Sequence, residues 1–104
     1  MAKRKRTVRR EEDKATSKLA KDLERLWRIE PGATAARAIP LASSSEVEVR
    51  ARGLRCPVCQ GEVRLLAHTA ETIEGARLRV AAVECSVCRR GRSLYFRLAG
   101  AVLN

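Results

Sequence analysis

The sequence predicts a small α+β protein, in which an N-terminal amphipathic helix precedes a C-terminal antiparallel β-sheet. Three observations predict this arrangement. Apolar residues repeat at helical spacing before Pro31, apolar and polar residues alternate after Ser45, and two pairs of cysteines enclose a segment long enough for a β-hairpin. A chain of 104 residues allows one small domain with extensions, and a domain this small usually needs a metal, disulfides or a partner for stability.

The first segment, residues 1–10, is expected to be a disordered basic arm. It is hydrophilic and has no apolar period. Its cations, which precede the first acidic residue, are Lys3, Arg4, Lys5, Arg6, Arg9 and Arg10. They supply much of the chain's formal charge of +10. An arm of this kind can neutralise phosphates and release counterions, so the segment favours contact with nucleic acid.

The second segment, residues 11–30, is expected to form an amphipathic helix. Acidic residues lie at its start, arginines lie at its end, and Pro31-Gly32 stops it. Its apolar positions at helical spacing are Ala15, Leu19, Leu23, Leu26 and Trp27. From Leu19 onward this stripe is a candidate partner-binding face, with Trp27 as its anchor. Alternatively, the stripe packs on the chain's own sheet or joins two copies, so monomer and homodimer both stay open.

The remaining chain is expected to hold a linker and a β domain. Residues 31–45 are expected to be the linker, because Gly, Pro and the run Ser43-Ser44-Ser45 follow neither period. Within the β domain, residues 46–104, alternating apolar residues predict strands at 46–52, 62–73, 77–84 and 93–98. A hairpin turn is predicted at Glu74-Gly75-Ala76, since glycine accepts a positive φ.

The strongest chemical signal is a set of four cysteines in two Cys-x-x-Cys pairs: Cys56, Cys59, Cys85 and Cys88. The 25 residues between the pairs are enough for two strands and a turn, which would return the second pair to the first. Four thiolates would then form a tetrahedral cage for one structural zinc ion. Iron in the same cage, a redox pair and four unrelated thiols are the alternatives. Two pairs on a β-rich segment fit a redox motif poorly.

Residues 46–98 resemble the zinc-ribbon family. The matching motifs are Cys56-Pro57-Val58-Cys59-Gln60-Gly61 and Cys85-Ser86-Val87-Cys88-Arg89-Arg90-Gly91. The resemblance implies two zinc knuckles on a three-stranded antiparallel sheet, as in transcription factors, polymerase subunits, ribosomal proteins and topoisomerase tails. Many knuckles have glycine directly after the second cysteine, where Gln60 and Arg89 stand in this chain. The motif implies a metal and a fold, and it says little about function.

The sequence favours a binding protein over an enzyme. His68 is the single histidine, no catalytic set can be assembled around it, and a closed four-sulfur site leaves no open position for water. We expect an accessory protein that binds nucleic acid within a transcription- or translation-related assembly. In the β domain, the candidate binding residues are Arg77, Arg79, Arg89, Arg90, Arg92 and Arg97. Because aromatic residues are scarce, the contacts should be to the backbone. The alternative is a protein adaptor that docks through the Trp27 helix while zinc is purely structural.

The expected location is cytoplasmic or nucleoid-associated, without secretion. No apolar run reaches the roughly 18 residues of a membrane span, so no membrane partner is expected. The basic start is not followed by the apolar region of a signal peptide. A reducing compartment in turn favours metal binding over disulfides for the cysteines.

Overall fold

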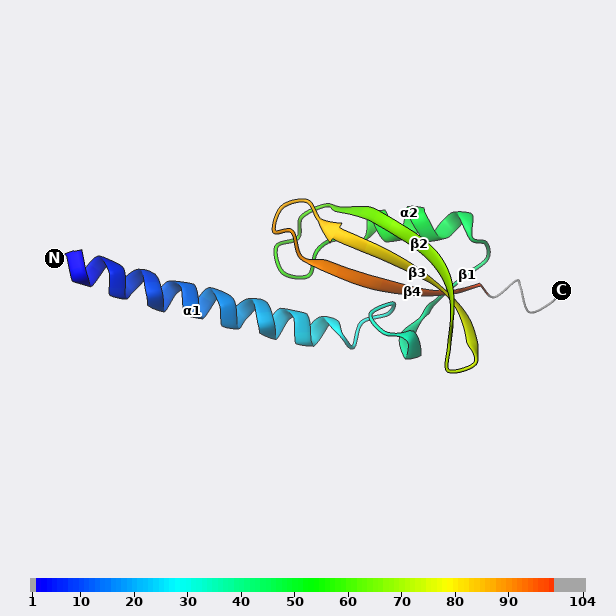
Figure 1. Ribbon diagram of the computed structural model, residues 1–104, viewed down its shortest axis with the longest axis horizontal. Helices are drawn as coiled ribbons and strands as arrows, with labels where there is room; N and C mark the ends of the chain where they lie inside the picture. The colour runs from blue at the N-terminus through cyan, green and yellow to red at the C-terminus, as the bar shows by residue number, and fades with distance from the viewer. Residues whose placement is uncertain (1, 99–104) are drawn as a thin grey trace.

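The computed structural model describes the backbone of residues 2–98 and the side chains of residues 14–98. The part of the predicted β domain after residue 98 lies outside the described residues. In chain order, the elements are helix α1 (Ala2–Trp27), the 3-10 turn η1 (Ala35–Arg37), strand β1 (Ile39–Leu41), helix α2 (Ser45–Gly53) and strands β2 (Val63–Ile73), β3 (Ala76–Cys85) and β4 (Gly91–Leu98) (Figure 1). No helix among the described residues is both long enough and apolar enough to cross a membrane.

The four strands form one mixed sheet in the order β1-β4-β3-β2. Strands β2, β3 and β4 run antiparallel as the sequence predicts, within one or two residues of the expected bounds. A two-residue turn joins β2 to β3, and both of its residues, Glu74 and Gly75, have positive φ. Such a turn matches the right-handed twist of the strands it connects. The small α+β class is confirmed, but the sheet is mixed because β1 pairs with β4 in parallel.

Strand β1 corrects the expectation of a linker at residues 31–45. This segment contains η1 and an edge strand whose Ile39 lies opposite Phe96 of β4 and is buried. Pro40 is tolerated in β1 because an edge strand needs hydrogen bonds on one side only. A three-residue strand that contains proline has no detectable sequence period, so the pattern could not predict it.

Helix α2 corrects the expectation of a strand at residues 46–52. Val47 and Ala51, four residues apart, are both fully buried, whereas Val49 is 73% exposed. The buried residues of this segment therefore follow the four-residue spacing of a helix and not the two-residue period of a strand. The Glu46 carboxylate accepts the N–H groups of Ala42 and Ser43 at 2.8 and 3.2 Å, which holds the segment that leads into the helix. Glutamates in the first turn and arginines in the last also suit the helix dipole.

Helix α2 lies along one face of the sheet and closes the core (Figure 1). Val47 and Ala51 join Val83 of β3 and Leu94 and Phe96 of β4 in one buried cluster. Cys56 and Cys85 belong to the same cluster. The core and the cysteine site are therefore continuous, so a substitution in the core should disturb the packing around the cysteines.

Helix α1 starts earlier than expected and includes residues 2–10, for which disorder was expected. Its residues contain no Gly or Pro and are rich in Ala, Lys, Arg and Glu, which are strong helix formers, so helix can extend without an apolar period. The helix ends at Trp27, slightly before the predicted end near residue 30. Its N-terminal half extends away from the sheet, and the molecule measures 70 × 23 × 16 Å (Figure 1).

Candidate metal centre

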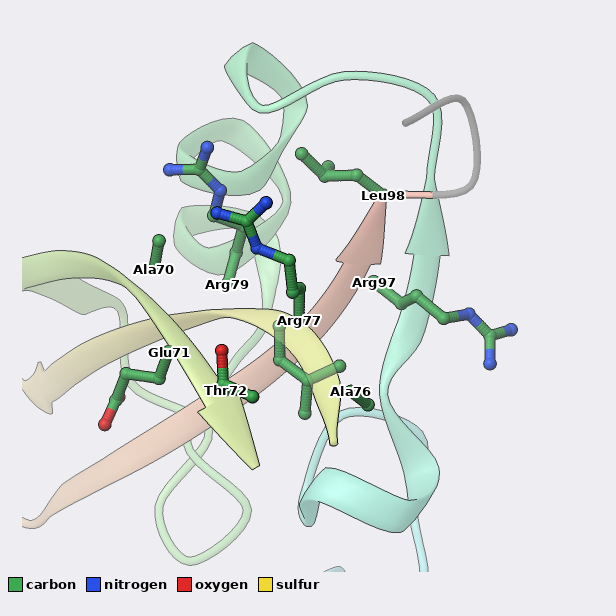
Figure 2. Close-up of a pocket in the computed structure, with 9 residues that line it drawn as sticks. Ala70, Glu71, Thr72, Ala76, Arg77, Arg79, Arg97 and Leu98 are labelled. Carbon is green, nitrogen blue, oxygen red and sulfur yellow. The ribbon is translucent and has the colours of Figure 1, made fainter. Parts of the chain in front are cut away.

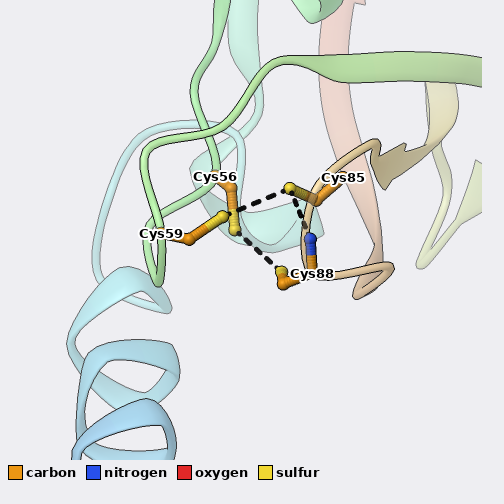
Figure 3. A group of neighbouring side chains, drawn as sticks. All are labelled: Cys56, Cys59, Cys85 and Cys88. Atoms are coloured by element: carbon orange, nitrogen blue, oxygen red, sulfur yellow. Dashed lines mark hydrogen bonds between the residues drawn. The ribbon is translucent and has the colours of Figure 1, made fainter.

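The four cysteines converge, as their spacing predicts (Figure 3). All four Sγ atoms lie within 4.8 Å of one another. The Sγ atoms of Cys56 and Cys88 are 3.7 Å apart, and those of Cys59 and Cys85 are 3.4 Å apart. Cys56 and Cys59 lie in the loop between α2 and β2, whereas Cys85 is the last residue of β3 and Cys88 lies in the loop that follows it. The β2–β3 hairpin brings the second pair back to the first.

The two loops have the same hydrogen-bond pattern. The Cys56 N–H donates to the Gly61 carbonyl at 3.0 Å, and the Cys85 N–H donates to the Arg90 carbonyl at 2.9 Å. The Gln60 and Arg89 N–H groups donate back to the carbonyls of the first cysteine in each loop, at 2.8 and 3.0 Å. These matched turns hold both thiols of a pair on the same side of the loop.

Gln60 and Arg89 have left-handed backbone conformations, with φ of 63° and 65°. Each directly follows the second cysteine of its pair, where glycine is common in zinc knuckles. A non-glycine residue pays roughly 1–2 kcal/mol for this conformation because Cβ approaches a carbonyl oxygen. Both loops therefore contain a left-handed residue at this position, although Gln60 and Arg89 are less stable in that conformation than glycine would be.

Backbone N–H groups and burial shift the pKa values of the Cys85 and Cys88 thiols in opposite directions. The N–H groups of Cys88 and Val87 donate to the Cys85 Sγ at 3.5 and 3.4 Å. Donation from Cys88 is the main cause that lowers the pKa of the Cys85 thiol, to about 6. Burial raises the pKa of the Cys88 thiol to about 11. Cys85 is therefore the more acidic of these two thiols.

This donor set fits one metal ion. Zinc–sulfur bonds of about 2.3 Å in a tetrahedron place neighbouring sulfurs roughly 3.8 Å apart. Two of the observed separations, 3.4 and 3.7 Å, are close to that value, and all four Sγ atoms lie within 4.8 Å of one another, so the sulfurs need to move by about 1 Å or less. Gly61 allows the approach of the two loops, because a Cβ there would lie 2.8 Å from Val87 Cγ2 and 3.0 Å from the Cys85 Sγ. Bound at these residues, a metal would cross-link the two loops.

Comparison with known proteins gives no match. No family model matches the sequence, and neither a curated protein nor a solved structure is similar enough to match it.

Arg92 of β4, expected from the sequence to bind nucleic acid, instead connects the cysteine site to α1. Its guanidinium forms two hydrogen bonds with the Glu24 carboxylate, at 2.8 and 2.9 Å. It also stacks over the Trp27 ring, 4.8 Å from the centroid, and Nη2 donates to the Cys56 Sγ at 3.6 Å. The Arg92 side chain is only 5% exposed. It is therefore not free to contact nucleic acid.

The remaining candidate arginines of the sheet do not form one surface. Arg89 pairs with Glu84, which also holds Arg64, and these contacts lower the pKa of Glu84, chiefly through the hydrogen bond from Arg64. Arg90 lines a cavity beside α1. The other three, Arg77, Arg79 and Arg97, lie around a cavity at the β2–β3 hairpin, at the opposite end of the sheet (Figure 2). His68 lies 4.0 Å from Glu48 of α2, away from the thiols.

Helix α1 meets the sheet through a stripe of which the apolar pattern of the sequence predicted only Trp27. Ala20 is buried, and Glu24 and Trp27 contact Arg92. These positions are each one residue after Leu19, Leu23 and Leu26, a rotation of about 100° around the helix. Leu19 and Leu26 consequently stay 58% and 61% exposed. The partly buried Glu24 hid this face from the apolar pattern, because its partner is an arginine 68 residues away.

A third stripe of α1 is basic. Its described members, all exposed, are Lys14, Lys18, Lys21, Arg25 and the flanking Arg28. Their spacing of four and three residues places them along one side of a helix. Within residues 14–98, none of them has a carboxylate oxygen within 4.0 Å. The same spacing continues backward in the sequence through Arg10, Arg6 and Lys3, whose side chains lie outside the described set.

Arg90 of the second cysteine loop meets the basic stripe. It lines one cavity with Lys21, Arg25 and Arg28, close to the C-terminal end of α1. Glu24 also borders this cavity, but both of its oxygens bind Arg92. The basic stripe thus continues from the helix onto the edge of the cysteine site.

Proposed function

We propose that this protein is a non-catalytic zinc protein that binds the phosphate backbone of nucleic acid through the basic stripe of α1 and Arg90. The observation that carries the proposal is a run of exposed cations, none of which has a carboxylate oxygen of residues 14–98 within 4.0 Å: Lys14, Lys18, Lys21, Arg25 and Arg28. Unpaired cations at regular spacing neutralise phosphates and release counterions. A place in a transcription- or translation-related assembly accords with this role.

Zinc is the metal that we assign to the four cysteines. Four thiolates at near-tetrahedral separation suit zinc, and four protein ligands close the site to substrate and water. In this proposal the ion is structural. It holds the two cysteine loops together and so fixes Arg90 and Arg92 relative to α1. Mass spectrometry of the native protein tests this assignment, and a chain without one tightly held zinc ion contradicts it.

The nucleic-acid proposal is tested by fluorescence anisotropy with duplex DNA, duplex RNA and single strands at two salt concentrations. Arg25→Gln with Arg28→Gln should weaken binding and lower the salt slope by about 0.9 for each lost contact to a duplex phosphate. The matched control, Arg50→Gln with Arg52→Gln, removes two exposed arginines from α2 and should leave affinity nearly unchanged. Equal weakening by both pairs would mean that only net charge matters. No binding at low salt ends the proposal.

A second candidate function is docking to a partner protein through the Leu stripe of α1. The observation that favours it is the exposure of Leu19 and Leu26, which the one-residue offset of the helix leaves uncovered. Trp27, the anchor expected from sequence, is half-buried against Arg92 and cannot serve. Affinity capture with and without nuclease separates the two functions. A protein partner retained after nuclease treatment and lost in Leu19→Ser with Leu26→Ser would support docking.

A further inference from the structure

The hairpin end of the sheet contains a cavity of about 570 Å³ that lies away from both α1 and the cysteines. Arg77, Arg79 and Arg97 contribute to its lining, and Leu78 and Leu98 supply apolar wall. Figure 2 shows these side chains around the end of the β2–β3 hairpin. A cavity of this size is within the range of small-molecule sites.

Arg77 and Arg79 extend from the same face of β3. Regular pairing places Arg77 opposite Thr72 and Arg79 opposite Ala70, so the two arginines are two residues apart on an undistorted strand. Their Cα atoms are therefore about 7 Å apart, and both side chains extend in the same direction in Figure 2. Thr72 is exposed and lies on the same face as Arg77, since directly opposite residues share a face.

No described carboxylate neutralises this pair. Across residues 14–98, neither arginine has a carboxylate oxygen within 4.0 Å. Glu71 also lines the cavity, but it lies opposite Leu78 and so on the other face of the strand, and it points away from the pair in Figure 2. Two guanidinium groups on one face repel each other unless an anion lies between them.

We propose that Arg77 and Arg79 bind a phosphomonoester, with the Thr72 hydroxyl as a further hydrogen-bond donor. Two planar guanidinium forks can each hold two phosphate oxygens, and a dianion removes the repulsion between them. The phosphomonoester can belong to a free phosphorylated molecule or to the 5′ end of a nucleic-acid strand. Arg97 follows Phe96, which lies opposite Arg79, so Arg97 is on the other face of the sheet. It points away from the pair in Figure 2 and takes no part. This site is separate from the α1 stripe, and it stands or falls without it.

The test uses the full zinc-loaded chain and follows the arginine Nε–H signals by NMR. The probes are inorganic phosphate, a nucleoside 5′-monophosphate, and one oligonucleotide with and without a 5′-phosphate. We expect the signals of Arg77 and Arg79 to shift together with phosphate and the monophosphate. Saturation by these small probes assigns a free ligand, whereas saturation by the 5′-phosphorylated oligonucleotide alone assigns a strand end. Either result supports the site.

The variants separate a built site from diffuse charge. Arg77→Gln and Arg79→Gln should each weaken the affinity roughly tenfold, the cost of losing one hydrogen-bonded charge contact. Arg97→Gln removes the same charge from the same cavity and should change affinity less than about twofold, since surface charges act weakly on one another. The proposal is overturned if all three variants weaken the affinity equally. It is also overturned if none of the phosphate-bearing probes, at millimolar concentration, shifts the Nε–H signal of either arginine. Arg25→Gln with Arg28→Gln should leave this affinity unchanged.

Discussion

Arg92 holds Glu24 in a two-bond ion pair at 2.8 and 2.9 Å, and this contact fixes α1 to the sheet. The guanidinium is nearly inaccessible, stacks on Trp27 and donates to the Cys56 Sγ. One side chain therefore links the helix that carries the basic stripe with a candidate metal ligand. Hydrogen bonds to ligand atoms of this kind orient the ligands and tune the metal.

Breaking this ion pair should destabilise the protein strongly. Arg92→Met is expected to cost about 3 kcal/mol in free energy of unfolding, because it leaves the partly buried Glu24 charge without a partner. Adding Glu24→Met should recover part of that cost. Chemical denaturation, monitored by Trp27 fluorescence, gives the free energy of unfolding of the wild type, both single variants and the double variant. This double-mutant cycle yields the coupling energy between Arg92 and Glu24. In the control cycle of Arg52→Met and Glu48→Met, an exposed pair at 3.9 Å, the coupling should stay below about 0.5 kcal/mol. Similar coupling in both cycles would contradict the role of Arg92.

Removal of the metal should unfold the β domain and release α1. Small metal-binding domains take much of their folding free energy from the ion, and here the cysteines are part of the core. Chelation or Cys59→Ser should abolish the β signal in circular dichroism and shift the Trp27 emission to longer wavelength. Helical signal from α1 should remain in part, because the helix is long. An intact β signal without metal would show that the ion is dispensable for folding.

Gly61→Ala should weaken metal binding roughly tenfold or more, the usual cost of disturbing groups that surround metal ligands. The new Cβ would lie 2.8 Å from Val87 Cγ2 and 3.0 Å from the Cys85 Sγ. Adding Val87→Ala should recover part of the loss, since it removes the closer contact. Competition with a chromophoric chelator measures the affinity. Gly53→Ala is the matched control, because no atom lies within 4 Å of the added Cβ, and it should bind metal normally.

Gln60→Gly should raise the free energy of unfolding of the metal-loaded protein by about 0.5–1 kcal/mol. Glycine adopts the positive φ of this position without a steric penalty, which outweighs its larger entropy in the unfolded chain. The neighbouring control, Arg90→Gly, has no positive φ to relieve and should destabilise. Thermal unfolding compares the two, and a destabilised Gln60→Gly would mean that its left-handed conformation is not strained.

Metal affinity should fall as pH falls. Protons compete with the metal for each thiolate, and the lowered pKa of about 6 means that Cys85 takes up its proton only as the pH falls towards that value. Cys88, whose pKa is raised to about 11, must instead lose a proton at neutral pH when the metal binds. Calorimetry in buffers of different ionisation enthalpy should therefore detect proton release near pH 8. Affinity that does not vary with pH would indicate that something other than thiolates binds the ion.

The cysteine cluster and the three antiparallel strands were predictable because their signals are local. Each Cys-x-x-Cys turn closes within six residues, and alternation in β4 reports directly on which side chains face the core. Strand β3 is instead buried on both faces, with Val80 on one and the core residues Ala81 and Val83 on the other. The strand expected at residues 46–52 was wrong for a related reason. Val47, Val49 and Ala51 satisfy a period of two, but Val47 and Ala51 also satisfy a helical spacing, and only packing against the sheet distinguishes the two.

By itself the sequence determined which residues can hold a metal and where the hairpin turns, since spacing along the chain decides both. Only the tertiary structure decided which face of α1 meets the sheet and which arginines stay free. That choice depends on Glu24 and Arg92, which lie far apart in the chain. Partial burial of either charge alone would cost free energy, and the ion pair between them offsets that cost.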